Sequence, residues 1–234
     1  MKNIVITGGT KGIGKAIAEK FAQEGFNIAI CARTAADLKL VKKELKEINA
    51  SIDILTMKVD MHAKKQVEKF AAKIIEKWDG VEVVVNNAAA FLQGSLLEEP
   101  AGRLEQMMGV NVFGSYHLTR KLLPNLVNQK KGHIFNICSV ASQRVYPNCA
   151  SYVISKFALL GFSKVLRQEL LDKSIKVTAV IPGATLTNSW AGVDLPKNRI
   201  MPPEDVANAI WNAYQMGPST TVEEIVMRPQ LGDL

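Results

Sequence analysis

The residues best suited to chemistry in this sequence are a tyrosine and a lysine four positions apart, Tyr152 and Lys156. On a helix, this spacing places both side chains on one face, one turn apart. A free phenol, with a pKa of about 10, holds its proton too firmly for acid–base work near neutral pH. A cation about 4 Å away, at an effective dielectric constant of about 20, can lower that pKa by about two to three units before desolvation is counted. We therefore expect Lys156 to lower the pKa of Tyr152.

A serine thirteen positions before Tyr152, Ser139, offers a second hydroxyl. It directly follows the apolar run 133–138, which predicts a buried strand that would deliver this hydroxyl to a fixed point. Tyr-x-x-x-Lys pairs occur often by chance. The pair therefore predicts catalysis only if the rest of the chain brings Ser139 and a binding site to the same place.

Apolar runs alternate with helical patterns along the whole chain. The runs predict strands at 3–7, 26–32, 52–59, 81–86, 133–138, 175–181 and 222–227. Between them, apolar residues at helical spacing predict helices, among them a long region at 101–128 that is interrupted or bent near Pro124, a helix at 151–171 and another at 203–215. Thr34 and Asp37 have the spacing of a helix N-cap box.

The predicted strands are apolar throughout, which is typical of strands that helices cover on both faces. Alternation of such strands with helices predicts an α/β fold with a doubly wound parallel sheet, in one domain over residues 1–234. These sheets bind dinucleotides at the carboxyl ends of their strands, where the strand order reverses. The candidate functional residues all lie at or just after strand ends, which favours a site there.

Three glycines, Gly8, Gly12 and Gly14, lie between the first predicted strand and the helix behind it. Glycines at this place permit a tight turn and the close approach of a pyrophosphate to backbone amides at a helix N-terminus. The spacing is not that of a Walker phosphate loop, and no Gly-Lys-Ser/Thr sequence follows. The glycine-rich turn therefore predicts a dinucleotide site.

The end of the second strand bears on the choice between NAD and NADP. A carboxylate there would bond the adenosine ribose and repel a 2′-phosphate, but this strand ends at Arg33 without one. Arg33 can hold a phosphate in a bidentate fork, and Lys11 in the glycine-rich turn adds a second cation. Asp37 would reverse the preference if the chain presents it to the ribose. The sequence favours NADP(H) and keeps NAD(H) as the alternative.

Composition argues against several other classes. The net charge is +7, but lysines and arginines are spread over predicted helix faces, so nucleic-acid binding is not favoured; the charge suits an anionic dinucleotide or an acidic carrier protein. The cysteines Cys31, Cys138 and Cys149 indicate no disulfide framework, and no Cys/His spacing resembles a metal site. No apolar run approaches the roughly 20 residues of a membrane span, and the first strand begins too early for a signal peptide. We expect a cytoplasmic protein with reduced cysteines.

In this order and spacing, the motifs resemble those of the short-chain dehydrogenase/reductase family over essentially the whole chain. The matching pieces are Thr7-Gly8-Gly9-Thr10-Lys11-Gly12-Ile13-Gly14, Asp60, Asn86-Asn87-Ala88-Ala89, Asn111, Ser139, Tyr152 with Lys156, and Pro182-Gly183 with Thr185 and Thr187. The resemblance is to the ordinary single-domain branch, with its 3-oxoacyl-ACP reductases and sepiapterin reductase-like carbonyl reductases. It implies a Rossmann fold with seven parallel strands in the order 3-2-1-4-5-6-7, and an oxidoreductase that interconverts a carbonyl and an alcohol.

The resemblance implies a role for each catalytic residue. Tyr152 would be the general acid in reduction and the base in oxidation. Lys156 would lower its pKa and hold the nicotinamide ribose, and Ser139 would bond the substrate oxygen where negative charge develops. Asn111 would hold a water that links Lys156 to solvent.

The resemblance also implies the cofactor contacts. Asp60 would contact the adenine and Asn87 the adenosine side, while Thr185 and Thr187 would meet the nicotinamide end. The full set is Gly8, Thr10, Lys11, Gly12, Ile13, Gly14, Arg33, Thr34, Asp60, Met61, Asn87, Ala88, Tyr152, Lys156, Pro182, Gly183, Thr185 and Thr187.

The sequence departs from the family pattern in places. Ala89 stands where the family usually has glycine, so that turn must accept a side chain. Arg144 and Tyr146 lie where small residues are common, so we expect them to line or narrow the mouth of the pocket. In the loop 188–201, Trp190 and Val193 form either an apolar lid or ordinary packing.

Three functional hypotheses follow. The leading one is a reductase of ketones or aldehydes of small or medium size with apolar character. The second is a 3-oxoacyl thioester reductase, which the basic surface would suit. The third is a dinucleotide-binding sensor or scaffold without catalysis, against which the intact set Asn111, Ser139, Tyr152 and Lys156 argues. The resemblance further implies a homodimer or homotetramer built through the helices near 101–128 and 151–171.

Overall fold

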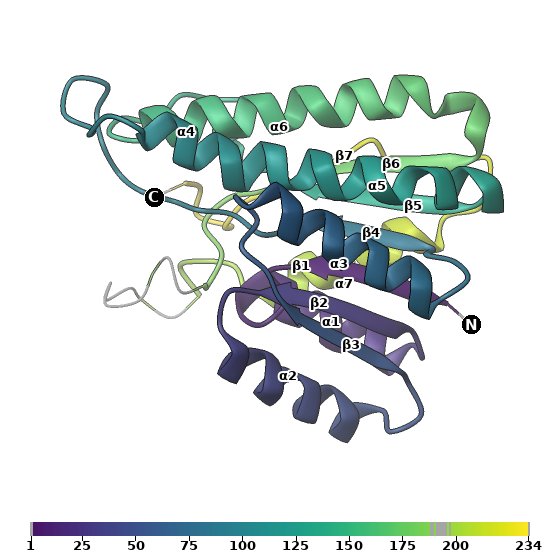
Figure 1. Ribbon diagram of the computed structural model, residues 1–234. Coiled ribbons are helices and arrows are strands. Elements are labelled where there is room, and N and C mark those ends of the chain that lie inside the picture. The colour runs from purple at the N-terminus through teal and green to yellow at the C-terminus, as the bar shows by residue number, and fades with distance from the viewer. Residues whose placement is uncertain (1, 188–189, 191–195, 197, 234) are drawn as a thin grey trace.

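A single parallel sheet forms the centre of the computed structural model, which describes residues 2–187, 190, 196 and 198–233. All its strands run in the same direction, in the predicted order β3-β2-β1-β4-β5-β6-β7 (Figure 1). The strands are β1 (Asn3–Thr7), β2 (Asn27–Ala32), β3 (Ile54–Lys58), β4 (Val83–Asn86), β5 (Gly132–Ile137), β6 (Ile175–Pro182) and β7 (Glu224–Met227). The prediction of a doubly wound parallel sheet is therefore confirmed.

Helices cover both faces of this sheet. They are α1 (Gly12–Gln23), α2 (Ala35–Ile48), α3 (Lys64–Lys77), α4 (Arg103–Met108), α5 (Gly114–Gln129), α6 (Ala150–Glu169) and α7 (Pro203–Gln215), with a π-helical turn η1 (Gly109–Phe113) and the 3₁₀ turns η2 (Val140–Ser142) and η3 (Leu171–Lys173). One buried cluster joins α1, α2 and α7 to the sheet, and another joins α3, α5 and α6 to its opposite face.

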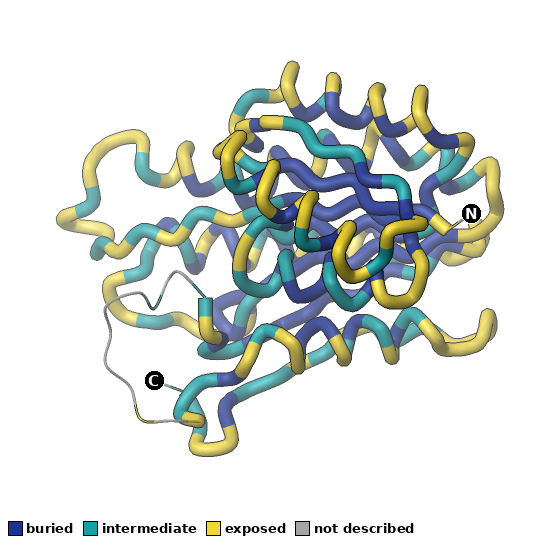
Figure 2. Tube along the Cα trace, turned by 90° about the horizontal axis from the view of Figure 1, so that it is seen from below, coloured by how far each residue is buried: buried dark blue, intermediate teal, exposed yellow. Residues whose placement is uncertain are grey.

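Alternate strand residues supply the two clusters, because successive side chains of a strand point to opposite faces. In β1, Ile4 and Ile6 belong to the cluster under α1, α2 and α7, whereas Val5 belongs to the other. Figure 2 shows the outcome: the strands in the middle of the sheet are buried, the edge strands β3 and β7 are only partly buried, and exposure is concentrated on the outer turns of the helices and in the connecting loops. A strand that is apolar on both faces reads as one continuous apolar run, which is why the strands were recognisable.

The long helical region differs from the prediction in one respect. We expected the region to be interrupted or bent near Pro124, yet α5 continues through Pro124, and the interruption is the π-helical turn η1 further upstream. Glycines flank this turn for a steric reason. A Cβ on Gly109 would lie 2.0 Å from His62 Nδ1, and one on Gly114 would lie 2.6 Å from the Met61 carbonyl oxygen. The close approach of the 61–62 turn therefore determines where the helix deviates.

The expected N-cap box at the start of α2 is also wrong. Thr34 occupies the N-cap position but makes no capping hydrogen bond through its side chain. Asp37 forms an ion pair with Lys11 instead, at 2.9 Å. The Asp37 carboxylate therefore links the first turn of α2 to the start of α1 rather than capping its own helix.

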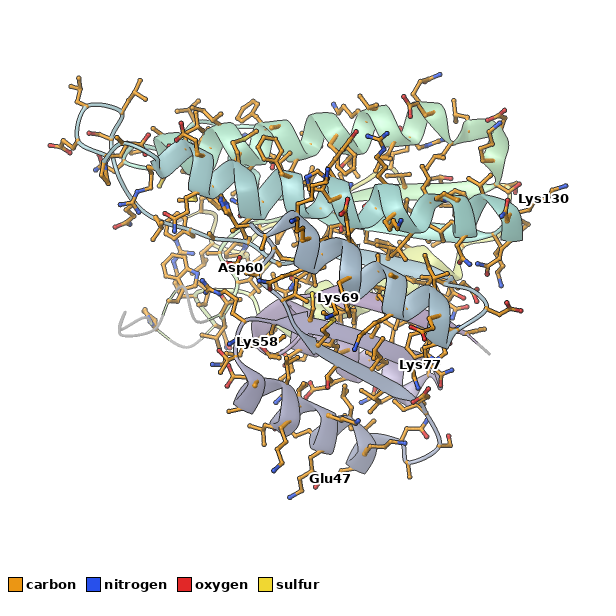
Figure 3. The ribbon with its side chains drawn as sticks, in the orientation of Figure 1. Glu47, Lys58, Asp60, Lys69, Lys77 and Lys130 are labelled. Atoms are coloured by element: carbon orange, nitrogen blue, oxygen red, sulfur yellow. The ribbon has the colours of Figure 1, made fainter. Side chains whose placement is uncertain are left out.

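The arrangement of the strands brings the candidate residues to one end of the sheet. Because all strands are parallel, their carboxyl ends lie at the same end of the sheet. The N-terminus and the C-terminus lie at opposite ends of the strands (Figure 1). Asp60, just after β3, lies at the end where the C-terminus is found, whereas Lys77 and Lys130 lie at the other end (Figure 3). The candidate site therefore lies at the carboxyl ends of the strands.

Candidate active site

Tyr152 and Lys156 lie in the first two turns of α6, as their spacing predicts, and Ser139 is the second residue after β5. The Ser139 hydroxyl lies within hydrogen-bonding reach of the Tyr152 hydroxyl and lowers the pKa of that phenol. Lys156 is buried, with 2% of its surface exposed, and its Nζ lies 5.7 Å from the centre of the Tyr152 ring. The three side chains that the sequence proposed as a group are thus brought together by one strand end and one helix.

Ser139 is oriented by its own turn. It caps η2: its Oγ accepts a hydrogen bond from the Ala141 backbone N–H at 3.1 Å, and its own N–H donates to Ser142 Oγ at 3.1 Å. Because Oγ already accepts this bond, the hydroxyl hydrogen remains free to donate to an oxygen outside the turn. Ser139 is therefore prepared as a donor toward the position of Tyr152.

The expected lowering of the Tyr152 pKa by Lys156 is not found in the structure. Burial raises the pKa of the Tyr152 hydroxyl to about 12, against the smaller opposing effect of Ser139. Burial also lowers the pKa of Lys156 to about 8, and its Nζ donates to the Ile137 carbonyl oxygen at 2.9 Å. Lys156 would lose its proton before the phenol does, so a tyrosinate beside an ammonium does not form by simple titration. Desolvation, which raises the pKa of a buried phenol, outweighs the effect that the spacing of the two residues predicts.

Asn111 lies in η1, and its buried side chain bonds this turn to Ala90 and to Ser155 of α6. Its Oδ1 accepts from the Ala90 N–H at 2.7 Å, while its Nδ2 donates to the Ala90 carbonyl oxygen at 3.1 Å and to Ser155 Oγ at 2.8 Å. Ser155 in turn donates to the Tyr152 carbonyl oxygen at 2.7 Å. Both amide hydrogens are therefore used within the protein, and a water held by this side chain would have to bond Oδ1.

The glycine-rich turn is packed against the end of β4. A Cβ on Gly14 would lie 2.4 Å from Asn87 Nδ2 and 2.5 Å from the Gly8 carbonyl oxygen, and Gly8 itself has a positive φ of 65°. Asn87 Nδ2 donates to the carbonyl oxygens of Thr7 and Gly8, at 2.9 and 3.0 Å. The Thr7 hydroxyl accepts from the backbone N–H groups of Asn87 and Ala88, both at 2.9 Å. Asn87 thus holds the turn, and its Oδ1 is the atom left to face a ligand.

The start of α1 fits a pyrophosphate. Lys11 is the N-cap residue, makes no capping hydrogen bond through its side chain, and is followed by no acidic residue in the first turn. The first N–H groups of such a helix attract an anion. A Cβ on Gly12 would lie 2.9 Å from Thr187 Cγ2, so the chain after β6 approaches the turn from the other side. Thr10 and Ile13 belong to this turn or to the first turn of α1.

Two cations and one carboxylate lie at the end of β2. Arg33 is exposed and forms no ion pair within the part of the chain that the structure describes. Lys11 pairs with Asp37, their side chains being 54% and 27% exposed. Thr34 is also exposed. Arg33 is therefore ready to meet an anion, whereas Lys11 would first have to exchange its partner.

The remaining predicted contacts line the same edge. Asp60 is exposed, and its Oδ1 accepts from the His62 N–H at 3.0 Å. Met61 is buried, and its sulfur accepts from Cys31 Sγ at 3.9 Å. Thr185 is buried and donates to the Gly183 carbonyl oxygen at 3.0 Å, in the turn after Pro182. Ala89 is exposed, and its φ is not among the positive values of the described chain, so this turn accepts the side chain without backbone strain.

Several residues at this edge were not found from the sequence. They are Thr7 and Ser155, which hold neighbouring residues; Phe91, whose ring contacts Tyr152; and the tail residues that meet Tyr146. Thr7 and Ser155 lie inside motifs that were already recognised, so their position was a signal. Nothing local in the sequence indicated the contacts of Phe91 or the tail.

Tyr146 is held by the C-terminal tail rather than lying open at a pocket mouth. Its hydroxyl donates to Asp233 Oδ2 at 2.8 Å, and Arg228 pairs with the same oxygen at 3.0 Å. Arg199 donates to the carbonyl oxygens of Gly232 and Asp233, both at 2.9 Å. Arg144 is exposed. The tail, the segment before α6 and the segment before α7 therefore form one connected wall.

The proposed apolar lid lies largely outside the described residues. Val193 and the residues 188–189, 191–192, 194–195 and 197 are not described, and of Trp190 the structure gives a backbone bond from its N–H to the Thr187 carbonyl oxygen at 3.0 Å. Over the described chain, no cluster of His, Cys, Asp and Glu has the make-up of a metal site. Nor is any described helix both long and apolar enough to cross a membrane.

Known proteins resemble this chain over nearly its full length. The model of the short chain dehydrogenase family matches residues 2–197. A sepiapterin reductase of Chlorobaculum tepidum is 33% identical, with 100% of this chain and 99% of that protein covered. An alcohol dehydrogenase from the archaeon Thermococcus sibiricus, solved with 5-hydroxy-NADP, superimposes with a TM-score of 0.91 at 28% identity, covering 98% and 97% of the two chains. The L-sorbose reductase of Gluconobacter frateurii, solved with NADPH and L-sorbose, gives 0.90 at 26% identity, covering 97% and 95%.

Proposed function

Since the chain belongs to the short-chain dehydrogenase/reductase family and is an oxidoreductase of that family, we propose that it reduces a ketone or aldehyde to the alcohol with NADPH. One observation carries this proposal. At the carboxyl end of β5, the Ser139 hydroxyl lies within hydrogen-bonding reach of the Tyr152 hydroxyl, and Lys156 of the same helix as Tyr152 is buried. A protein that only binds a dinucleotide has no need of this group of side chains.

In the proposed reaction, the dinucleotide supplies the hydride, and the protein supplies position and a proton. Tyr152 donates its hydroxyl proton to the carbonyl oxygen. Ser139, whose hydrogen is free, donates a hydrogen bond to the same oxygen as negative charge develops. Lys156 holds the nicotinamide ribose and stabilises the tyrosinate, and Asn111 anchors the path by which the proton is replaced.

The raised pKa of Tyr152 suits the role of proton donor. With a pKa raised to about 12 by burial, Tyr152 keeps its proton at all ordinary pH values. Reduction needs a proton donor, whereas alcohol oxidation needs the deprotonated form, which is scarce under these conditions. Tyr152 is therefore held in the protonated form that the reduction step requires.

Arg33 is the residue proposed to bind the 2′-phosphate of NADP(H). It is exposed at the end of β2, where no carboxylate follows the strand directly. Relatives crystallised with NADP(H) support this choice. Arg33→Ala is expected to weaken NADPH binding by at least tenfold, about the strength of one charge-assisted hydrogen bond, and NADH binding much less. Fluorescence titration with both cofactors tests this; parallel losses would contradict the assignment.

The substrate is proposed to be an uncharged carbonyl compound of small or medium size. The sepiapterin reductase relative adds pteridine-type diketones to the classes worth testing. A 3-oxoacyl thioester remains the second candidate because the net charge of +7 suits an acidic carrier. We further propose a homodimer or homotetramer built through α5 and α6, and a cytoplasmic location, with which the free thiols of all three cysteines agree.

The deciding experiment is NADPH oxidation by the purified protein with a panel of carbonyl compounds. The panel contains simple ketones, aldehydes, diketones, a pteridine-type diketone and a short 3-oxoacyl thioester. Tyr152→Phe is run beside the wild type and is expected to lose about a thousandfold in turnover, within the usual range for an acid catalyst, while binding NADPH nearly unchanged. Equal activity in the variant would rule out the mechanism, and a wild type inactive on every compound would favour the sensor hypothesis.

A further inference from the structure

An aromatic side chain that the proposed mechanism does not use lies directly against Tyr152. The rings of Phe91 and Tyr152 meet edge to face, with their centres 4.9 Å apart and their planes at 85°. Phe91 nevertheless keeps 40% of its surface exposed. A single exposed aromatic residue is ordinary on a protein surface. One that touches the proton donor leaves apolar surface at the point that the substrate carbonyl must reach.

We propose that Phe91 determines substrate specificity by receiving a flat apolar group attached to the carbonyl carbon. The preferred substrates would be ketones and aldehydes with an aryl or similarly planar apolar substituent. This inference rests on the function proposed above and names the substrate class of the same site. A planar substituent can pack against an aromatic ring with a preference of about two- to tenfold over a non-planar group of similar size.

The position of Phe91 is fixed by its neighbour in the chain. Both backbone groups of Ala90 are bonded to the Asn111 side chain, the N–H at 2.7 Å and the carbonyl oxygen at 3.1 Å. Asn111 is itself buried and bonded to Ser155, one residue before Lys156. The residue that carries the aromatic ring is therefore anchored to the same helix as the catalytic pair, and the ring does not depend on a free loop.

The far side of the segment is also attached to the start of α6. The Gly94 N–H donates to the Asn148 carbonyl oxygen at 2.9 Å, and the Ala150 N–H donates to the Gly94 carbonyl oxygen at 3.1 Å. Ser151 then donates to Glu99 Oε1 at 2.6 Å. Segment 90–99 thus crosses in front of the first turn of α6 and is held at three points. A segment bonded in this way can present a side chain to the site with little freedom to move.

The charges around Phe91 agree with an uncharged substituent. Its sequence neighbours Ala90 and Leu92 are apolar, and Leu92 is partly buried. Lys156, the cation beside Tyr152, is buried and bonded to the Ile137 carbonyl oxygen. It is therefore not free to pair with a carboxylate or phosphate on the substrate, whereas a planar apolar group could pack against the exposed part of the Phe91 ring.

The test compares two ketones of similar size that differ in planarity, acetophenone and cyclohexyl methyl ketone, with NADPH and the purified full-length protein. The wild type is expected to prefer acetophenone in kcat/KM. Phe91→Leu, which keeps an apolar side chain but removes the flat face, is expected to lower that preference about two- to tenfold. Leu96→Ala is the matched control, since Leu96 lies in the same segment and is 75% exposed; it should leave the preference unchanged.

Each other result overturns the inference. A purely structural role through Tyr152 would lower kcat/KM for both ketones equally and leave their ratio at the wild-type value. A wild type without preference, or one that reduces other carbonyls of the panel but neither ketone, would also contradict it while leaving the proposed function intact. A wild type that reduces no carbonyl at all would instead contradict the proposed function. NADPH affinity, measured in every variant, should stay constant.

Discussion

The two sides of this site are built in different ways. On the proposed cofactor side, the glycine-rich turn is packed so tightly that a Cβ on Gly14 would lie 2.4 Å from Asn87 Nδ2 and 2.5 Å from the Gly8 carbonyl oxygen. On the substrate side, separate segments are joined by side chains, as where Tyr146 and Arg199 bond the C-terminal tail. The glycine-rich turn has no room for an added side-chain atom, whereas the bonds to the tail can be removed one side chain at a time.

This difference has a functional consequence. A dinucleotide presents the same pyrophosphate to every enzyme that uses it, so a rigid turn at a helix N-terminus serves well. Substrates vary, and a wall made of side-chain bonds can be altered without disturbing the sheet. We therefore expect substitutions on the cofactor side to be costly and general, and those on the substrate side to be smaller and selective.

The largest effect is expected for Gly14→Ala. The added methyl group would overlap the Gly8 carbonyl oxygen and Asn87 Nδ2, so the turn would have to shift away from the position that receives the pyrophosphate. We expect NADPH affinity to fall about a hundredfold and the protein to lose about 1–3 kcal/mol of stability. Calorimetric titration and thermal unfolding measure the two effects.

Gly217→Ala is the control for this change, because a Cβ at Gly217 would meet nothing within 4 Å. It should leave both quantities almost unchanged. If Gly14→Ala behaved like the control, the turn would accept a side chain that the contacts exclude, and the contrast between the two sides would be wrong.

How far the sequence predicted each side follows from the same difference. The strand order, the glycine turn and the group Ser139, Tyr152 and Lys156 depend on local patterns or familiar motifs, and the fold was correctly predicted from them. The pKa of Tyr152 was not, because it depends on burial that no spacing reveals. Neither was the bond of Tyr146 to Asp233, which joins residues 87 positions apart in the chain. Side-chain contacts across such separations leave no periodic signal.

Lowering the pH is expected to decrease the stability of the whole fold, and both sides of the site should be lost together because both are built on the same sheet. His133 in β5 is buried, and its Nε2 lies 2.7 Å from Thr178 Oγ1. The Thr178 hydroxyl donates to the Val222 carbonyl oxygen, so Nε2 must carry the hydrogen of the neutral ring. Nδ1 is buried and has no hydrogen-bond partner within the described structure. Burial, with a smaller effect of Lys176, lowers the pKa of His133 to about 3.

The sign of the effect follows from this shift. Between pH 6.5, the ordinary pKa, and about 3 the unfolded chain binds a proton that the native state does not. Stability from this group is therefore full above pH 6.5 and falls by about 1.4 kcal/mol, or tenfold in the unfolding equilibrium, per pH unit below it. Urea unfolding from pH 7 to pH 4 should show a shallower slope in His133→Gln than in the wild type or in the exposed control His62→Gln. Identical slopes in all three would contradict the assignment.

A smaller and selective effect is expected for Asp233→Asn on the substrate side. The carboxylate accepts from Tyr146 and pairs with Arg228, and it is 24% exposed. Removing its charge loosens the wall before α6, so KM for the carbonyl substrate should rise about three- to tenfold while NADPH affinity stays constant. Asp172→Asn, which removes an exposed carboxylate paired with Lys173, is the control. Equal changes in KM and NADPH affinity would show that the tail supports both sides.

The smallest effect is expected for Asp37→Asn, which removes the ion-pair partner of Lys11, a proposed contact of the 2′-phosphate. Asp37 holds Lys11 at 2.9 Å in a largely exposed ion pair, so Lys11 must exchange this partner for the 2′-phosphate. An exposed pair contributes at most about 1 kcal/mol. Freeing Lys11 should therefore raise NADPH affinity about two- to fivefold at low salt and less at high salt, with NADH unaffected. Glu47→Gln, which changes the net charge equally through an exposed pair with Lys43, should not reproduce the gain. A loss of NADH affinity in Asp37→Asn would mean that this carboxylate binds the adenosine ribose, and NAD(H) would then become the preferred cofactor.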